Sequence, residues 1–215
     1  MNTFANYRKL TAPSQLKQLY DTVAPTWQAG IENLGYMDAY SELAERACDA
    51  APTAENETIL DAGTGSGAMS LAMTSVHDKA PDMQLSDLSP VMLEQAAARV
   101  PGTVRTVVGL IGCANLPEHR FDRVLCAHVI EHTVDPVASL EWLRDRLRPG
   151  GQIVLAISRP HWCTALLRWR FGNSAYRPEK VCQFLDAAGF KDISVHRHRR
   201  GPPSRTSCGY IAYTP

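Results

Sequence analysis

Three glycines preceded and followed by carboxylates carry the strongest chemical signal in this sequence. Asp61 is followed by Gly63, Gly65 and Gly67, and Asp87 closes the next expected strand. Glycines in such a loop let the backbone turn tightly and approach a ligand, and the helix start that follows offers free N–H groups. A carboxylate at Asp87 can accept both hydroxyl protons of a ribose. The pattern therefore predicts a site for a nucleotide-like ligand.

Two kinds of cofactor fit this loop. Gly63-x-Gly65-x-x-Ala68 satisfies the dinucleotide pattern G-x-G-x-x-G/A, so a nicotinamide-dependent oxidoreductase stays open as an alternative. Asp61 lies two positions before the first glycine, where a carboxylate can meet an ammonium group, which S-adenosylmethionine has and a dinucleotide lacks. The loop also follows a helical segment instead of opening the chain, and no second catalytic domain is left for a dehydrogenase. These features favour methyl transfer.

The elements that must position these residues alternate between strands and helices. Strands are expected at 58–60, 83–87, 104–108, 123–127 and 152–158, and helices at 66–76, 90–99 and 136–147, the last closed by Pro149-Gly150-Gly151. Ser89 and Pro90 suit the N-cap and first position of their helix. After a helix at 178–188, two strands at 192–197 and 207–213, joined by a Gly-Pro-Pro turn, predict an antiparallel edge hairpin. The alternation predicts an α/β fold with a mostly parallel sheet.

Helical spacing over 11–51 predicts an N-terminal cap. We therefore divide the chain into a helical cap or lid, 1–51, and an α/β domain, 52–215, within one structural unit. The 22 basic residues balance the 22 acidic ones, so the charge gives no reason to expect nucleic acid as a partner. Six widely spaced cysteines and the lack of a signal peptide or membrane span predict a cytoplasmic protein without integral membrane contact.

The chain resembles class I S-adenosylmethionine-dependent methyltransferases, especially the small-molecule branch that includes the ubiquinone and menaquinone biosynthesis enzymes. The resemblance rests on four stretches in the family's order: ILDAGTGSG at 59–67, DLSPVML at 87–93, FDRVLCAHVIEH at 121–132 and LRPGG at 147–151. It implies a Rossmann-like fold with a seven-stranded sheet and an N-terminal lid, with YDTVAPTW at 20–27 as the lid segment.

The resemblance also implies a set of residues around S-adenosylmethionine. Asp61 would face the methionine part, Asp87 the ribose, and Ala127 and His128 the sulfonium. The full implied set is Tyr20, Asp61, Gly63, Thr64, Gly65, Gly67, Asp87, Leu88, Met92, Cys113, Ala114, Ala127 and His128.

One position departs from the family. Members often carry an Asp that accepts a hydrogen bond from the adenine amino group, where this chain reads Gly112-Cys113-Ala114. Because cysteine is a weak acceptor, the change could cost roughly 1.5 to 3 kcal/mol of cofactor binding. Cys113 therefore keeps a non-catalytic cofactor-binding protein open as a second alternative.

His128-x-x-Glu131-His132 carries the candidate acid–base chemistry. The spacing matches the inverted zinc-protease spelling H-x-x-E-H, but it begins right after a strand, so no metal is expected. Glu131 and His132 can instead brace the loop by hydrogen bonds. If the acceptor loses a proton, His132 is the first choice for a general base and His128 the second.

The sequence identifies neither the methyl acceptor nor the oligomeric state. Candidate residues for acceptor binding are Trp27, His161, Trp162 and Tyr176, which lie in the lid or beyond the fifth strand. A basic run at 196–200, with Arg205, has two interpretations. A solvated edge is favoured, and an anion-binding or lipid-headgroup role is the alternative.

Overall fold

A seven-stranded sheet organises the molecule. The structure is a computed structural model that describes residues 13–161 and 174–215. The strands are β1 (Thr58–Ala62), β2 (Asp82–Asp87), β3 (Val104–Val108), β4 (Phe121–Ala127), β5 (Leu147–Ser158), β6 (Lys191–His196) and β7 (Ser207–Tyr213). Their order is β3-β2-β1-β4-β5-β7-β6. The expected α/β fold with a seven-stranded sheet is confirmed.

The strand directions bring the carboxyl ends of five parallel strands to one edge of the sheet, where a ligand can bind. Strands β3, β2, β1, β4 and β5 are parallel, and β7 runs antiparallel to both β5 and β6. The expected antiparallel edge hairpin is therefore present. The strand order reverses between β1 and β4, and in open α/β sheets ligands bind beyond the carboxyl ends of the strands at such a point.

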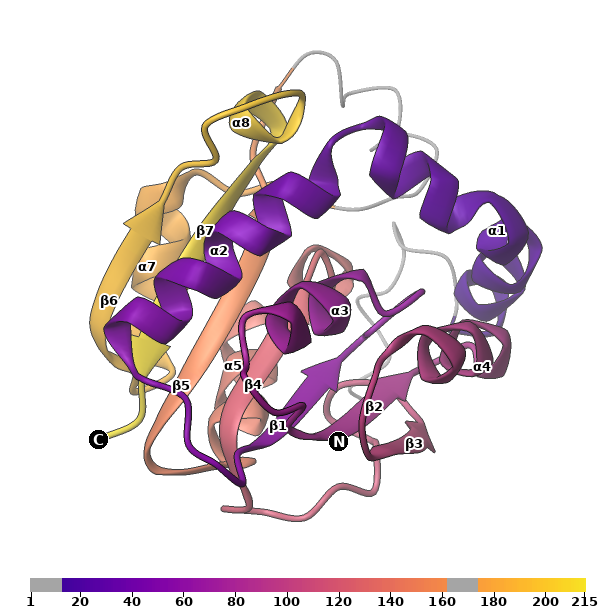
Figure 1. Ribbon diagram of the computed structural model, residues 1–215. Coiled ribbons are helices and arrows are strands. Elements are labelled where there is room, and N and C mark those ends of the chain that lie inside the picture. The colour runs from indigo at the N-terminus through magenta and orange to yellow at the C-terminus, as the bar shows by residue number, and fades with distance from the viewer. Residues whose placement is uncertain (1–12, 162–173) are drawn as a thin grey trace.

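Helices cover both faces of the sheet (Figure 1). They are α1 (Pro13–Asn33), α2 (Tyr36–Ala50), α3 (Ala68–Ser75), α4 (Pro90–Arg99), α5 (Pro136–Arg144), α7 (Pro178–Ala187) and the short α8 (Pro203–Thr206). One apolar core joins the sheet to α2, α3 and α4, and another joins it to α5 and α7. Because Leu43 and Ala47 of α2 are buried in the first core, the N-terminal helical region shares a core with the sheet.

Local signals placed most elements, and one boundary was wrong. Ser89 caps α4 as expected, since its Oγ accepts a hydrogen bond from Met92 N. The helix expected to reach 147 ends at Arg144, and β5 already begins at Leu147. Leu147 is buried and pairs with Phe121, so this strand pairing overrides the Pro-Gly-Gly stop signal, which lies inside β5. A short helix, α8, also stands in the connection expected to be a turn.

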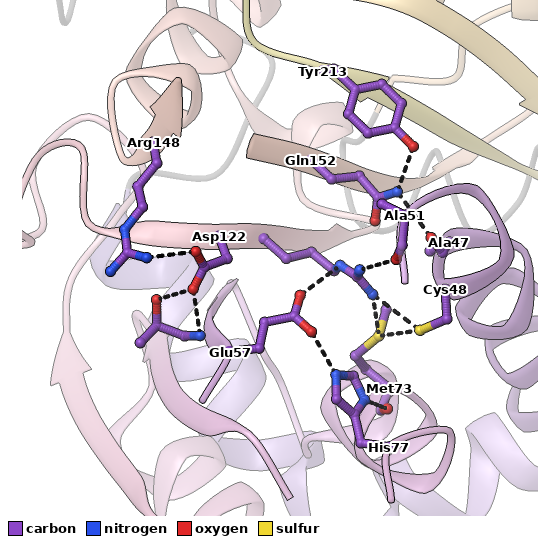
Figure 2. Close-up of polar contacts among 12 residues, drawn as sticks. Ala47, Cys48, Ala51, Glu57, Met73, His77, Asp122, Arg148, Gln152 and Tyr213 are labelled. Atoms are coloured by element: carbon purple, nitrogen blue, oxygen red, sulfur yellow. Dashed lines mark hydrogen bonds and ion pairs between the residues drawn. The ribbon is translucent and has the colours of Figure 1, made fainter. Parts of the chain in front are cut away.

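A buried ion pair ties helices to the amino-terminal ends of the strands. Arg123 is 2% exposed, and its Nε lies 3.1 Å from Oε1 of Glu57. Oε2 of Glu57 lies 2.7 Å from His77 Nε2, as Figure 2 shows. Arg123 also donates to Ala51 O at 3.0 Å and contacts Cys48 Sγ at 3.1 Å. This cluster fastens α2 and the end of α3 to β1 and β4.

Among the described helices, none is long and apolar enough to cross a membrane.

Candidate functional site

The glycine loop lies between β1 and α3, at the carboxyl edge of the sheet. Gly63, Gly65 and Gly67 all have positive φ, at 75°, 53° and 85°. A Cβ on Gly63 would lie 2.3 Å from Val129 Cγ2, so the segment after β4 approaches the loop too closely for any side chain there. The amides of Gly63 and Thr64 donate to Ser86 O at 2.7 and 3.0 Å. The loop is therefore fixed in a conformation that requires glycine.

Asp61 is buried directly beneath this loop. Its Oδ2 accepts hydrogen bonds from Thr64 Oγ1 at 2.9 Å and Ser70 Oγ at 2.6 Å. Its Oδ1 is buried and has no hydrogen-bond partner within residues 13–161 and 174–215. Burial raises the pKa of Asp61 to about 6. A buried carboxylate oxygen without a partner is costly, and a ligand that donates to it, such as an ammonium group, would remove that cost.

Asp87 closes β2 and holds the loop in place. Its Oδ2 accepts from Gly65 N and its Oδ1 from Ser89 N, both at 2.9 Å. Burial raises the pKa of Asp87 in spite of these bonds. Met92, one turn into α4, is buried, and Leu88 is half-buried. Because each carboxylate oxygen has a second lone pair, Asp87 can support the loop and still accept from a ribose.

Helix α1 lies beside the glycine loop and contacts it. Trp27 Nε1 comes within 3.6 Å of a Cβ built on Gly65, and Ser66 Oγ donates to Gln28 Oε1 at 2.7 Å. Nearer the amino terminus of the same helix, Asp21 accepts a hydrogen bond from Ser89 Oγ. Sequence reasoning missed Gln28 and Asp21, because only the packing of α1 on the loop brings them there.

Tyr20 connects the lid to the His-x-x-Glu-His segment. Its hydroxyl lies 3.4 Å from His132 Nε2, and its ring packs edge-on against Trp27 with centroids 5.7 Å apart. Burial raises the pKa of Tyr20 well above 10, so the phenol stays neutral. Tyr20 and Trp27 thus lie at one site, together with a histidine from the far side of the loop.

The side chain of His128, just after β4, contacts one carboxylate and two hydroxyl groups. The hydroxyls come from the end of β5 and the start of β7. Its Nδ1 lies 3.1 Å from Glu131 Oε1 and 3.0 Å from Ser158 Oγ, and its Nε2 lies 3.4 Å from Ser207 Oγ. His128 has φ +58°, a conformation that non-glycine residues seldom adopt. Such strain commonly marks functional positions. The ring also meets Tyr36 edge-on, with centroids 5.3 Å apart.

Glu131 is fully buried between the two histidines. Burial opposes its ionisation, but the hydrogen bond and charge of His128 and the amide of Ser158 outweigh it and lower the pKa of Glu131. Its Oε2 has no partner in the described part of the chain, and neither does the buried Nδ1 of His132. Burial lowers the pKa of His132, so its ring is neutral near pH 7. Two histidines and a carboxylate thus share one end of the sheet with the glycine loop.

The remaining predicted site residues are more scattered. Cys113 is exposed and Ala114 buried in the loop after β3, while Ala127 ends β4 half-buried. His161 is half-buried just after β5. The ring of Tyr176 packs edge-on against Phe184 of α7, with centroids 5.1 Å apart.

Two further predictions concern Trp162 and a metal. Trp162 lies outside the described residues. Among residues 13–161 and 174–215, no group of three or more His, Cys, Asp or Glu side chains is placed to hold a metal ion.

Comparison with known proteins identifies the family. The family model for a methyltransferase domain matches residues 34–195, so the chain belongs to this methyltransferase family. The family uses S-adenosylmethionine. Asp61, with its unpartnered oxygen beside a glycine loop, fits the ammonium group of this cofactor.

The curated relatives differ in what they act on. Demethylmenaquinone methyltransferase of Clavibacter sepedonicus is 30% identical over 149 residues, which cover 66% of this chain and 58% of that protein. A tRNA U34 carboxymethyltransferase of Shewanella frigidimarina is 39% identical over 105 residues, or 47% of this chain and 31% of that protein. The chain therefore spans less than two thirds of the length of these relatives. Because one relative is named for tRNA, the expectation of no nucleic-acid partner stays a prediction.

Solved structures share the fold at low identity. The [4+2]-cyclase SpnF has a TM-score of 0.74 and 17% identity, covering 96% of this chain and 97% of its own. Phosphoethanolamine N-methyltransferase 2 of Haemonchus contortus, in complex with S-adenosyl-L-methionine, has a TM-score of 0.74 and 15% identity, covering 93% of this chain and 60% of its own. These likenesses confirm the Rossmann-like fold.

Proposed function

We propose that this protein binds S-adenosylmethionine at the glycine loop and transfers its methyl group to a small-molecule acceptor in the cytoplasm. The observation that carries the proposal is the buried Oδ1 of Asp61, which has no partner among the described residues and lies beneath a loop of three left-handed glycines. A dinucleotide has no ammonium group to offer this oxygen. Asp87, at the end of the neighbouring strand, would accept from the ribose hydroxyls.

The bound cofactor supplies a methyl group on a sulfonium, which is already a good leaving group. The protein's part is to hold the acceptor in line and, where the acceptor loses a proton, to take that proton. His128 suits this role because Glu131 orients its ring and its side chain is 22% exposed. His132 is more deeply buried and contacts Tyr20, so we assign it to bracing the closed lid.

The acceptor pocket would lie where α1, the start of α2 and the carboxyl ends of β4 and β5 meet. Tyr36 of α2 packs against His128, and its hydroxyl lies 3.2 Å from Thr206 Oγ1. Trp27 and His161 remain candidates for acceptor contact. Two relatives are named demethylmenaquinone methyltransferase and ubiquinone biosynthesis O-methyltransferase, so demethylmenaquinone and ubiquinone precursors are the first acceptors to screen.

Calorimetric titration with S-adenosylmethionine, S-adenosylhomocysteine and NADH tests the cofactor. We expect both sulfur ligands to bind and NADH not to bind. Asp61→Asn should weaken S-adenosylmethionine binding about tenfold or more, because it removes a charge-assisted hydrogen bond. Asp82→Asn is the matched control, since Asp82 begins β2 at the opposite end of the sheet and its carboxylate forms an ion pair with exposed Arg105.

Preferential binding of NADH, or S-adenosylmethionine binding that Asp61→Asn leaves unchanged, would contradict the proposal. Asp87→Ala is a less specific test, because Asp87 also holds Gly65 N and Ser89 N. Loss of binding in that variant would not separate a ribose contact from a displaced loop.

A further inference from the structure

A pocket lies away from the glycine loop, between α2 and the end of β6 with the segment that follows it. Figure 1 shows α2 crossing the β5–β7 side of the sheet, whereas the glycine loop joins β1 to α3. Leu43 and Val195 supply apolar parts of its wall. The polar lining residues are Glu42, Arg46, His196, Arg197, His198 and Arg199. Most of the basic run seen in the sequence therefore faces a hollow against α2.

The charges of this pocket do not balance. Glu42 is its acidic lining residue, and both carboxylate oxygens are engaged by Arg199, Oε1 with Nε at 2.9 Å and Oε2 with the backbone N at 3.2 Å. Arg46 and Arg197 are exposed and make no ion pair or hydrogen bond within the part of the chain that the structure describes. Two guanidinium groups from different elements thus face one hollow without a counter-charge.

His198 adds a buried polar group to the same wall. The residue is 5% exposed, and its Nε2 is buried without a hydrogen-bond partner among the described residues. Burial lowers the pKa of His198 to about 4, so the ring is neutral near pH 7 and the positive charge comes from the arginines. His196, on the other side of Arg197, is half-buried, and its Nε2 lies 2.9 Å from Ser194 Oγ.

We propose that this pocket binds the phosphate group of a phosphate monoester. Guanidinium groups match the oxygens of phosphate in geometry and charge. A dianion balances Arg46 and Arg197 together, whereas a single carboxylate would leave one of them unpaired. The phosphate also brings acceptor oxygens to a wall that contains His198, whose Nε2 has no partner within residues 13–161 and 174–215. None of the residues that line this pocket belongs to the glycine loop.

Titration of the whole protein with inorganic phosphate tests the proposal. Calorimetry at constant ionic strength, adjusted with sodium chloride, separates specific binding from screening. We expect saturable binding that weakens about tenfold or more in Arg46→Gln and in Arg197→Gln, because each substitution removes one charge-assisted contact. Arg200→Gln is the matched control, since Arg200 belongs to the same basic run and is exposed but does not line the pocket. Unfolding midpoints without phosphate show whether each variant is folded.

The source of the phosphate is separated by a second set of probes. Glycerol 3-phosphate represents a soluble monoester, and vesicles of phosphatidylcholine with phosphatidic acid represent a lipid headgroup. Binding of either probe that follows the variant pattern of inorganic phosphate supports the site and identifies the source. Absence of saturation, equal weakening in Arg200→Gln, or binding to vesicles without any response to inorganic phosphate would overturn the proposal.

Discussion

Asp61→Asn should stabilise the protein without cofactor while weakening its cofactor site. The carboxylate of Asp61 is fully buried and has a pKa of about 6, against an ordinary value of 3.8. A raised pKa means that burial disfavours the ionised form in the folded state. At pH 7 the group is ionised in both states, so the folded protein carries the cost.

The size of this cost follows from the pKa difference. The change from 3.8 to about 6 corresponds to roughly 3 kcal/mol of unfolding free energy. The folded state binds the proton more tightly, so stability from this group is complete below pH 3.8, falls as the pH rises towards 6 and stays reduced above it. Asparagine avoids the charge but keeps a polar amide in the same place. We therefore expect a gain of about 1 to 3 kcal/mol at pH 7, or roughly 2 to 12 °C in melting temperature.

Thermal unfolding at pH 7 and pH 4, with and without S-adenosylmethionine, measures both halves of this prediction. The variant should melt higher than the wild type at pH 7 without cofactor, and the advantage should shrink at pH 4. Saturating S-adenosylmethionine should raise the melting temperature of the wild type more than that of the variant. A variant that melts lower than the wild type at pH 7 and binds the cofactor as tightly would contradict both expectations.

Three other substitutions have definite expected outcomes. Arg123→Ala should lower the unfolding free energy by about 3 to 5 kcal/mol in urea denaturation, because it leaves Glu57 charged and buried without its partner. Gly63→Ala should abolish cofactor binding in calorimetry and lower the melting temperature, because its Cβ would meet Val129 at 2.3 Å and its φ is +75°. Glu131→Gln should lower the methylation rate for a proton-losing acceptor and change its pH profile, because the Glu131 carboxylate contacts the ring of His128, the proposed base, and orients it.

The first two of these variants each have a reference that isolates the cause. Arg105→Ala removes an exposed ion pair with Asp82 and should cost at most about 1 kcal/mol. Gly150→Ala shares a positive φ but meets no atom within 4 Å, so it measures backbone strain without the clash. Equal losses in a variant and its reference would show that the buried partner or the clash contributes nothing. A Glu131→Gln enzyme with an unchanged pH profile would remove Glu131 from the proton transfer.

Local chemistry predicted the elements on both sides of the glycine loop. The Ser89 cap and the glycine loop depend on neighbours in the chain, so they could be read from the sequence. The start of β5 could not, because Leu147 pairs with Phe121 across the sheet, and that contact overrides a local Pro-Gly-Gly signal. The hydrogen-bond partners of His128 could not be predicted from the sequence either, since Ser207 comes from a strand far along the chain. Both features, the start of β5 and the contacts of His128, depend on pairing between segments that are distant in the chain.

The buried carboxylates at opposite ends of the sheet differ in how completely their oxygens are paired. At the amino-terminal end, both oxygens of Glu57 contact Arg123 or His77, and the cluster joins helices to strands. At the carboxyl end, Asp61 and Glu131 each keep one buried oxygen without a partner in the described residues. Buried polar groups are normally satisfied, so the first arrangement is what stability alone selects. The second is the arrangement expected where a ligand supplies the missing partners.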